Sequence, residues 1–248
     1  MLVSASLWAI DAGLRVASLN LCTDEYLLLL AQPAEIASVS RLAKDRQESP
    51  LWRIAAPFTA NRGTIESLIA TRPTMLITMG GGGRSTAALA SRMGMKVVDL
   101  PYPATIREVE ENMVRVAAAL GEPSRAAAWR TRLHRLKPPE TQRDTIFLAG
   151  GGLTVTKGSL ADQWMALAGL KQRNIAGGRA SLETLAIRPP DILLRSNYRV
   201  GQRSQGQAWL AHPLANPARS KIIATDGRVW TCAGPMMVDE IQRLQSVR

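Results

Sequence analysis

Side chains suited to holding a small molecule follow the predicted strands of this sequence, in both halves of the chain. Aromatic and thioether groups pack on apolar surfaces, and guanidinium groups pair with carboxylates or phosphates. Ligands of open parallel sheets bind beyond the carboxyl ends of the strands, so these residues predict a cleft for a large, partly apolar and partly anionic molecule. The candidate ligand-binding residues are Cys22, Asp24, Met79, Arg84, Tyr102, Tyr198, Arg199, Trp230 and Cys232.

The two cysteines, Cys22 and Cys232, each follow a predicted strand, one in each half of the chain. Neither belongs to a C-x-x-C motif. Four interpretations stay open: ligation of a metal, contact with a ligand, a disulfide across the cleft, or two unrelated half-buried thiols. A disulfide between the halves would restrict any opening of the cleft. The number of cysteines alone does not establish the redox compartment.

Residue types that perform catalysis are sparse. The histidines are His134, which lies among arginines in a predicted helix, and His212, which precedes a proline. They offer no histidine-rich metal site and no Ser-His-Asp arrangement. Asp24, Asp99 and Asp226 could act as general bases, but no two carboxylates are convincingly paired for acid–base catalysis.

Four consecutive glycines, residues 80–83, follow the third predicted strand. They lack the G-x-G-x-x-G spacing of a dinucleotide site, and no Lys-Ser/Thr follows them as in a P-loop. We therefore predict a flexible turn that lets a ligand approach the backbone.

The same short phrase occurs twice in the chain, at Thr64–Pro73 and at Ser181–Pro190. Each copy reads as a helix cap, a glutamate, a short apolar helix and a proline stop, and a buried strand follows. Glu66 and Glu183 hold the same place in the two copies, 117 positions apart. Taken alone, either glutamate is ordinary charge in the first turn of a helix. The pair predicts two similar lobes and a partner that contacts both.

Strand and helix patterns alternate along the chain, which predicts an α/β fold with parallel sheets. A long helical stretch without strand signals separates the two α/β halves and reads as a rigid connector. The predicted strands are 15–19, 36–40, 75–79, 97–100, 145–149, 191–195 and 221–225, and residues 226–235 read as a loop. The predicted helices are 24–31, 65–71, 85–93, 160–168, 182–187, 203–211 and 236–247. The predicted units are an N-terminal lobe (15–103), a helical connector (104–139) and a C-terminal lobe (140–248).

The chain has 31 Lys and Arg residues against 20 Asp and Glu residues, a net charge of +11. Such a charge suggests nucleic acid, an anionic membrane surface or an acidic ligand. The arginines are scattered, however, and the densest stretch, Arg125–Arg143, resembles a solvated helix face. We find no nucleic-acid motif and favour a role of the charge in solubility or steering.

The first residues, 1–14, are apolar and rich in small side chains, and they lack a basic start. They read as the remnant of a secretory signal peptide or as a disordered segment. No run of eighteen apolar residues occurs, so the sequence predicts no transmembrane helix.

From about residue 15 onward, the sequence resembles the ABC-transporter periplasmic substrate-binding proteins that carry vitamin B12, ferric siderophores or haem. Arg15–Glu25 is similar to that family's first strand and cleft loop. Glu66–Ile77 and Glu183–Leu194 are similar to its phrase in each lobe, and Leu160–Ala176 to its G-x-x-x-x-L-x-x-x-G-G-x-N-I-A segment. The resemblance implies two Rossmann-like lobes with parallel sheets, joined by a long backbone helix, with the ligand between them.

The resemblance also implies a function and partners. The protein would be a monomeric periplasmic component of a bacterial ABC importer that binds a metal chelate, a corrinoid or a ferric siderophore. It would need no cofactor of its own and would break no bond. Glu66 and Glu183 match the glutamates that dock on arginines of the permease dimer, which works with its ATPase subunits. A helical connector implies a small hinge motion.

Each candidate residue then receives an expected role. Trp230, Tyr198, Tyr102 and Met79 would pack on the ligand, Arg84 and Arg199 would pair with its carboxylates or phosphate, and Cys22, Asp24 and Cys232 would line the cleft floor. Two departures from the family pattern stand out. Thr74 replaces the usual Asp of the first phrase, and the tryptophans that stack on corrin rings are not all at matching places.

Two other readings compete with this one. An enzyme or cofactor carrier with nitrogenase-like lobes would use the cysteines to hold a metal cluster, but two are too few for an ordinary four-thiolate cluster. A nucleic-acid-binding protein would account for the charge, and steep salt dependence of DNA binding would support it.

Overall fold

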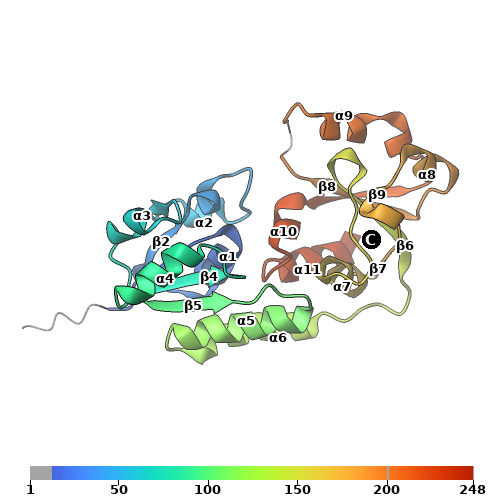
Figure 1. The fold of residues 1–248 in the computed structure, drawn as a ribbon. Helices are drawn as coiled ribbons and strands as arrows, with labels where there is room; N and C mark the ends of the chain where they lie inside the picture. The colour runs from blue at the N-terminus through green and yellow to red at the C-terminus, as the bar shows by residue number, and fades with distance from the viewer. Residues whose placement is uncertain (1–12, 200, 248) are drawn as a thin grey trace, which may run out of the picture.

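The computed structural model describes residues 13–199 and 201–247, which form two α/β lobes (Figure 1). The N-terminal sheet has the strand order β3-β2-β1-β4-β5, the C-terminal sheet has the order β7-β6-β8-β9, and the paired strands run parallel. The predicted α/β fold with two parallel sheets is confirmed. The strands are β1 (Val16–Ser18), β2 (Ile36–Ser40), β3 (Ala60–Asn61), β4 (Met75–Met79), β5 (Lys96–Leu100), β6 (Arg143–Leu148), β7 (Leu170–Gln172), β8 (Ile192–Asn197) and β9 (Lys221–Asp226).

Helices connect the strands, as parallel pairing requires. The α-helices are α1 (Leu21–Leu30), α2 (Trp52–Ala55), α3 (Ile65–Ile69), α4 (Arg84–Arg92), α5 (Ile106–Ala119), α6 (Ala127–Arg135), α7 (Leu160–Leu167), α8 (Leu182–Ile187), α9 (Gln205–Ala211), α10 (Gly227–Cys232) and α11 (Met237–Val247). Short 3-10 helices cover residues 33–35, 41–44, 123–126, 150–152, 176–178 and 213–215. Residues 1–12 of the predicted signal-peptide remnant lie outside the described residues.

The repeated phrase folds the same way in both lobes. Thr64 and Ser181 are the N-caps of α3 and α8, and each accepts a hydrogen bond from a backbone N–H of the first turn. The strands that follow, β4 and β8, each pair on both sides within their sheet. The phrase therefore marks equivalent places in the two sheets.

The first helix begins earlier than we predicted. Asn20, not Thr23, is the N-cap of α1, because the Asn20 side chain accepts the backbone N–H of Thr23 at 3.0 Å. The Thr23 side chain completes the capping box. This earlier start places Cys22 in the first turn of α1.

The helical connector is a pair of helices, α5 and α6, which Figure 1 shows beneath the lobes. A buried apolar stripe on α5 (Val109, Met113, Val116, Ala117) packs inward, and α5 contacts both α1 and α7. Arg130 Nε and Glu110 Oε1, 2.6 Å apart, join the two helices. The connector thus touches an element of each lobe.

Four short elements were not predicted, and one of them is the four-residue helix α2. The two-residue strand β3 and the three-residue strand β7 lie at sheet edges, where pairing with a neighbouring strand defines them. Residues 227–232, which we predicted as a loop, form the helix α10. Asp226 caps this helix by accepting the backbone N–H of Arg228 at 3.0 Å.

One hydrophobic core continues through both lobes and the connector. Two buried indole groups hold the same segment from different sides: Trp129 Nε1 donates to Pro235 O at 2.9 Å, and Trp164 Nε1 donates to Ala233 O at 2.8 Å. Each buried indole finds an acceptor, as burial of a polar group requires. The segment before α11 is therefore fixed by the connector and by the C-terminal lobe together.

Glu25 on α1 faces this same segment from the N-terminal lobe. Its side chain is buried, and among the described residues neither carboxyl oxygen has a hydrogen bond of good geometry. A Cβ atom at Gly234 would lie 2.8 Å from Glu25 Oε2, so glycine leaves the room that the carboxyl needs. The pKa of Glu25 is raised to about 8, chiefly by burial; the backbone N–H of Met236 lowers it and the charge of Asp24 adds to the rise.

We expect Glu25→Gln to increase the free energy of unfolding at pH 8 by on the order of 2 kcal/mol. The folded protein holds a proton on Glu25 up to about pH 8, whereas the unfolded chain releases it near pH 4.5. Stability therefore falls as the pH rises through this window. Glutamine stays neutral, so the variant lacks the decrease in unfolding free energy that ionisation of Glu25 causes. Urea unfolding from pH 5 to 8 measures it, with the exposed Glu140→Gln as control; a variant that is less stable than the wild type at pH 8 contradicts the prediction.

Candidate ligand-binding site

A disulfide joins the two lobes near the carboxyl ends of their sheets. Cys22 on α1 follows β1, Cys232 ends α10 after β9, and the two are bonded with their Cα atoms 5.4 Å apart. Of the four interpretations of the cysteines, the structure selects the disulfide between the lobes. Neither thiolate is then available to a metal.

A pocket of about 370 Å³ lies at the carboxyl ends of β6 and β8, beside α10. Its lining includes three of the predicted ligand residues, Tyr198, Arg199 and Trp230. The rings of Trp230 and Phe147 meet with centroids 5.1 Å apart and planes inclined by 57°. The pocket therefore has an aromatic wall, with a phenol and a guanidinium group also in its lining.

A chain of hydrogen bonds fixes the indole of Trp230. Its Nε1 donates to Thr225 Oγ1 at 2.6 Å, and the Thr225 hydroxyl is hydrogen-bonded to Glu240 on α11. Arg243 Nε donates to Glu240 Oε2 at 2.9 Å, which completes the chain. Because each buried group is paired, the indole is fixed in one orientation before any ligand arrives.

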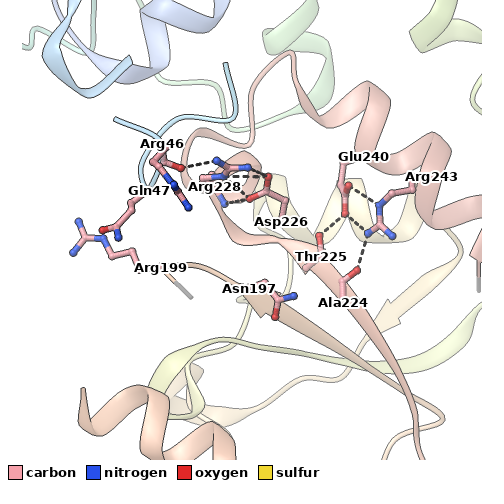
Figure 2. Close-up of a pocket in the computed structure, with 10 residues that line it drawn as sticks. All are labelled: Arg46, Gln47, Asn197, Arg199, Ala224, Thr225, Asp226, Arg228, Glu240 and Arg243. Carbon is pink, nitrogen blue, oxygen red and sulfur yellow. Dashed lines mark hydrogen bonds and ion pairs between the residues drawn. The ribbon is translucent and has the colours of Figure 1, made fainter. Parts of the chain in front are cut away.

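A second pocket of about 590 Å³ lies on the other side of Arg199, and Figure 2 shows its lining. Both lobes contribute to it. Arg46 and Gln47 come from the N-terminal lobe, and the other residues come from β8, β9, α10, α11 and the segment after β8 that carries Arg199. Figure 2 shows two of its arginines engaged by acids, Arg228 by Asp226 and Arg243 by Glu240. The four arginines outnumber the two carboxylates in the lining, which makes the pocket a basic surface.

The segment after the second strand of the N-terminal lobe crosses to the C-terminal lobe. Arg228 Nη1 donates to Arg46 O at 2.6 Å and to Ser49 O at 3.2 Å. The hydroxyl of Tyr198 donates to Glu48 Oε2 at 2.5 Å, and Arg199 forms an ion pair with the same carboxylate. The lobes are thus joined beside the pocket as well as through the disulfide.

These contacts change the ionisation of the predicted ligand residues. Burial, followed by the Glu48 carboxylate, raises the pKa of Tyr198. The hydrogen bond to Glu48 raises the pKa of Arg199. Both shifts favour the protonated forms, so Tyr198 is a neutral hydrogen-bond donor and Arg199 is a cation at neutral pH.

Two predicted ligand contacts are wrong in this structure. Met79 is 2% exposed and belongs to the hydrophobic core, so it offers no surface to a ligand. Asp24 is 1% exposed and accepts Ser40 N at 2.9 Å and Ser40 Oγ at 2.5 Å, which ties α1 to β2. Burial raises the pKa of Asp24 to about 6, against these hydrogen bonds. Both side chains point into the lobe, and Asp24 therefore does not line the cleft floor.

The remaining candidates of the N-terminal lobe lie away from the aromatic wall. Arg84 begins α4 and lines a separate pocket of about 330 Å³ with Gly81 and Asp99. Tyr102 follows β5, is 67% exposed, and its ring covers Gly80, where a Cβ would lie 1.9 Å from the ring. Their roles toward a ligand stay predictions.

Several residues of the site were missed from the sequence. Phe147 in β6 and Arg228 after β9 sit at strand ends, so the same rule could have included them. Thr225 and Glu240 act behind Trp230, and their pairing joins a strand to a helix. Glu48 lies between the second and third predicted strands, in a polar stretch for which we predicted no helix or strand, and no local signal marks it.

Glu66 and Glu183 are exposed in the first turns of α3 and α8, as predicted for docking residues. Neither carboxylate makes an ion pair with any cation in the part of the chain that the structure describes. The backbone N–H of Glu183 and the Ser181 hydroxyl lower the pKa of Glu183, so it stays ionised. Both acids are therefore free to meet cations of another molecule.

The chain thus has two parallel-sheet lobes joined by a disulfide, and an aromatic pocket lies in the C-terminal lobe. The family model described as periplasmic binding protein matches residues 16–138, and the chain resembles that family over this stretch. The resemblance of the chain to ABC-transporter substrate-binding proteins is confirmed. No curated protein matches the sequence.

Solved structures extend the likeness of fold to most of the chain. The periplasmic haem-binding protein HutB of Vibrio cholerae has a TM-score of 0.74 at 19% identity, covering 94% of this chain and 98% of that one. A periplasmic haem-binding protein from Pseudomonas aeruginosa has a TM-score of 0.69 at 20% identity, covering 94% and 91%. The vitamin B12-binding protein BtuF of Vibrio cholerae has a TM-score of 0.62 at 17% identity, covering 94% and 95%. No helix among the described residues is long and apolar enough to span a membrane.

Proposed function

We propose that this protein is the solute-binding component of an ABC importer and that it carries a metal chelate, a corrinoid or a ferric siderophore, between its lobes. The observation that supports this most is the pocket of Trp230 and Phe147 at the carboxyl end of one parallel sheet, where Glu48 of the other lobe reaches Tyr198. An aromatic wall suits the apolar frame of such a chelate. Solved proteins of the same fold are named as binding haem and vitamin B12, which favours this ligand class.

Transport would also need a permease, and Glu66 and Glu183 are suited to docking on it. Substrate-binding proteins of ABC transporters work with a permease and its ATPase subunits. Glu66 and Glu183, exposed at equivalent places of the two lobes, would meet arginines of the two permease subunits. Rim ion pairs of this kind set orientation and encounter rate more than affinity. In this arrangement a single copy of the chain serves the permease dimer.

The bacterial periplasm is the compartment that we propose. The disulfide between Cys22 and Cys232 supports it, because disulfides persist in oxidising compartments. Secretion across the inner membrane would be required for this location.

Binding, without catalysis, accounts for the site better than the enzyme reading does. A nitrogenase-like protein would use thiolates to hold its cluster, but Cys22 and Cys232 are bonded to each other. Asp24, one of the possible general bases, is buried against Ser40, and Asp226 is held by Arg228. Neither is placed to take a proton from a bound molecule.

Titration of the purified protein with four chelates tests the proposal: cyanocobalamin, ferrichrome, ferric enterobactin and haemin. Tryptophan fluorescence reports binding, after unfolding and oxidative refolding to strip any bound ligand. We expect saturable quenching by at least one chelate at submicromolar concentration. No response to any of the four contradicts the proposed ligand class.

Trp230→Leu should weaken binding of that chelate by about a hundredfold, because a central buried aromatic anchor of a binding site typically contributes 2–4 kcal/mol. Isothermal calorimetry measures the affinity without relying on the fluorescence of the removed indole. Trp209→Leu is the matched control, since Trp209 is a half-buried tryptophan of the same lobe outside the pocket lining. Equal losses in both variants would show that the effect is one of folding and that Trp230 is not a ligand contact.

A further inference from the structure

Glu48 places a carboxylate of the N-terminal lobe on the ligand pocket of the C-terminal lobe. Its side chain is 12% exposed, and it accepts Tyr198 Oη at 2.5 Å and pairs with Arg199. Both donors line the pocket that holds Trp230 and Phe147. A phenol and a guanidinium that converge on one carboxylate form a recognition site for an acidic group.

The segment that carries Glu48 is shaped by contacts other than those two donors. Asp45 accepts Gln47 N at 2.8 Å with its side chain and Ser49 N at 2.9 Å with its carbonyl. Arg228 of the C-terminal lobe holds the carbonyls on either side of Glu48, at Arg46 and Ser49. The Glu48 backbone would therefore stay near the pocket if its side chain turned away.

Arg199 has the backbone geometry of a specialised residue. Its φ is 51°, in the left-handed region that a residue with a Cβ rarely adopts. Such a conformation persists where the surroundings hold it, often at a ligand site. Here it accompanies a guanidinium that reaches the Glu48 carboxylate, and the arginines of the neighbouring basic pocket, Arg46 and Arg228, add positive charge nearby.

We infer that Glu48 stands in for an acidic group of the cargo, and that the cargo is an anionic chelate with carboxylate or catecholate oxygens at its edge. The inference rests on the proposed function and narrows its ligand class. When the chelate enters the pocket, its acidic group takes the Tyr198 and Arg199 donors, and the Glu48 side chain turns away. Glu48 thus competes with anionic cargo and repels it, while a neutral chelate has no group to exchange for it.

The test compares Glu48→Gln with the wild-type protein on a matched pair of ferric siderophores, the anionic ferric enterobactin and the uncharged ferrichrome. Glutamine keeps the shape of the side chain but lacks its charge. We expect the affinity for ferric enterobactin to rise about tenfold and that for ferrichrome to change less than twofold. Arg199→Gln should lower the affinity for ferric enterobactin about tenfold. Glu111→Gln is the control, since Glu111 pairs with Arg107 on the connector.

Each outcome either supports or overturns the inference about Glu48. A gain in Glu48→Gln that is confined to the anionic chelate supports the inference. A loss of the anionic chelate, or equal changes for both chelates, overturns it, because Glu48 would then be a ligand contact or a general closure of the pocket. Binding of ferrichrome alone, unchanged in the variant, overturns the inference and leaves the proposed function standing. If neither these two nor cyanocobalamin and haemin bind to the wild type or the variant, the proposed function fails and the inference fails with it.

Discussion

Replacing Cys22 and Cys232 together by serine will lower the free energy of unfolding by about 3 kcal/mol. The disulfide closes a loop with a sequence separation of 210 residues, so it removes a large part of the conformational freedom of the unfolded chain. It also joins the two lobes directly. Equilibrium unfolding in urea, under oxidising conditions, measures the difference between the wild type and the double variant.

A reducing agent provides the control for this result. Dithiothreitol should destabilise the wild-type protein to the level of the double variant, and it should leave the double variant unchanged. A double variant that is as stable as the oxidised wild type contradicts the prediction. In that case the shared core between the lobes would hold them without help from the bond.

Replacing Glu66 and Glu183 together by alanine will abolish chelate transport while the affinity for the chelate changes less than twofold. Both carboxylates are exposed on short helices, and neither residue lines the aromatic pocket. Without them the permease arginines have no ion-pair partners, so the binding protein docks on the permease more slowly and in less defined orientations. Uptake into proteoliposomes that contain the importer's permease and ATPase subunits measures the effect.

Glu111→Ala with Glu140→Ala is the matched control, since it removes one exposed acid from the connector and one from the start of the C-terminal lobe and should leave uptake unchanged. Retained uptake in the Glu66 and Glu183 variant would show that these residues do not dock. A parallel loss of chelate affinity would place them at the ligand site instead of the permease.

Much of the fold could be predicted because its signals are local. The helix predicted at 182–187 is α8 with the same bounds, and the strand predicted at 75–79 is β4. A capping residue at one end and a proline at the other define such elements without reference to distant residues. The edge strands β3 and β7 and the helix α10 escaped prediction because pairing or packing with distant segments defines them.

The site was predicted only in part. The rule that ligands bind at strand ends selected Tyr198, Arg199 and Trp230, which line one pocket. The same rule failed for Met79, because every residue of β4 is buried and Met79 belongs to the hydrophobic core. A residue at the end of a strand therefore reaches a ligand only where packing leaves its side chain uncovered.

The sequence by itself determined the two α/β lobes, the helical connector and the pair of exposed glutamates, since helical and strand periodicity and the repeated phrase are properties of neighbouring residues. Only the tertiary structure decided that Cys22 bonds to Cys232 and that Glu48 meets Tyr198 and Arg199. These partners come from different lobes and lie more than a hundred residues apart in sequence. Such contacts depend on how the lobes pack against the connector and against each other, and no local pattern records that packing.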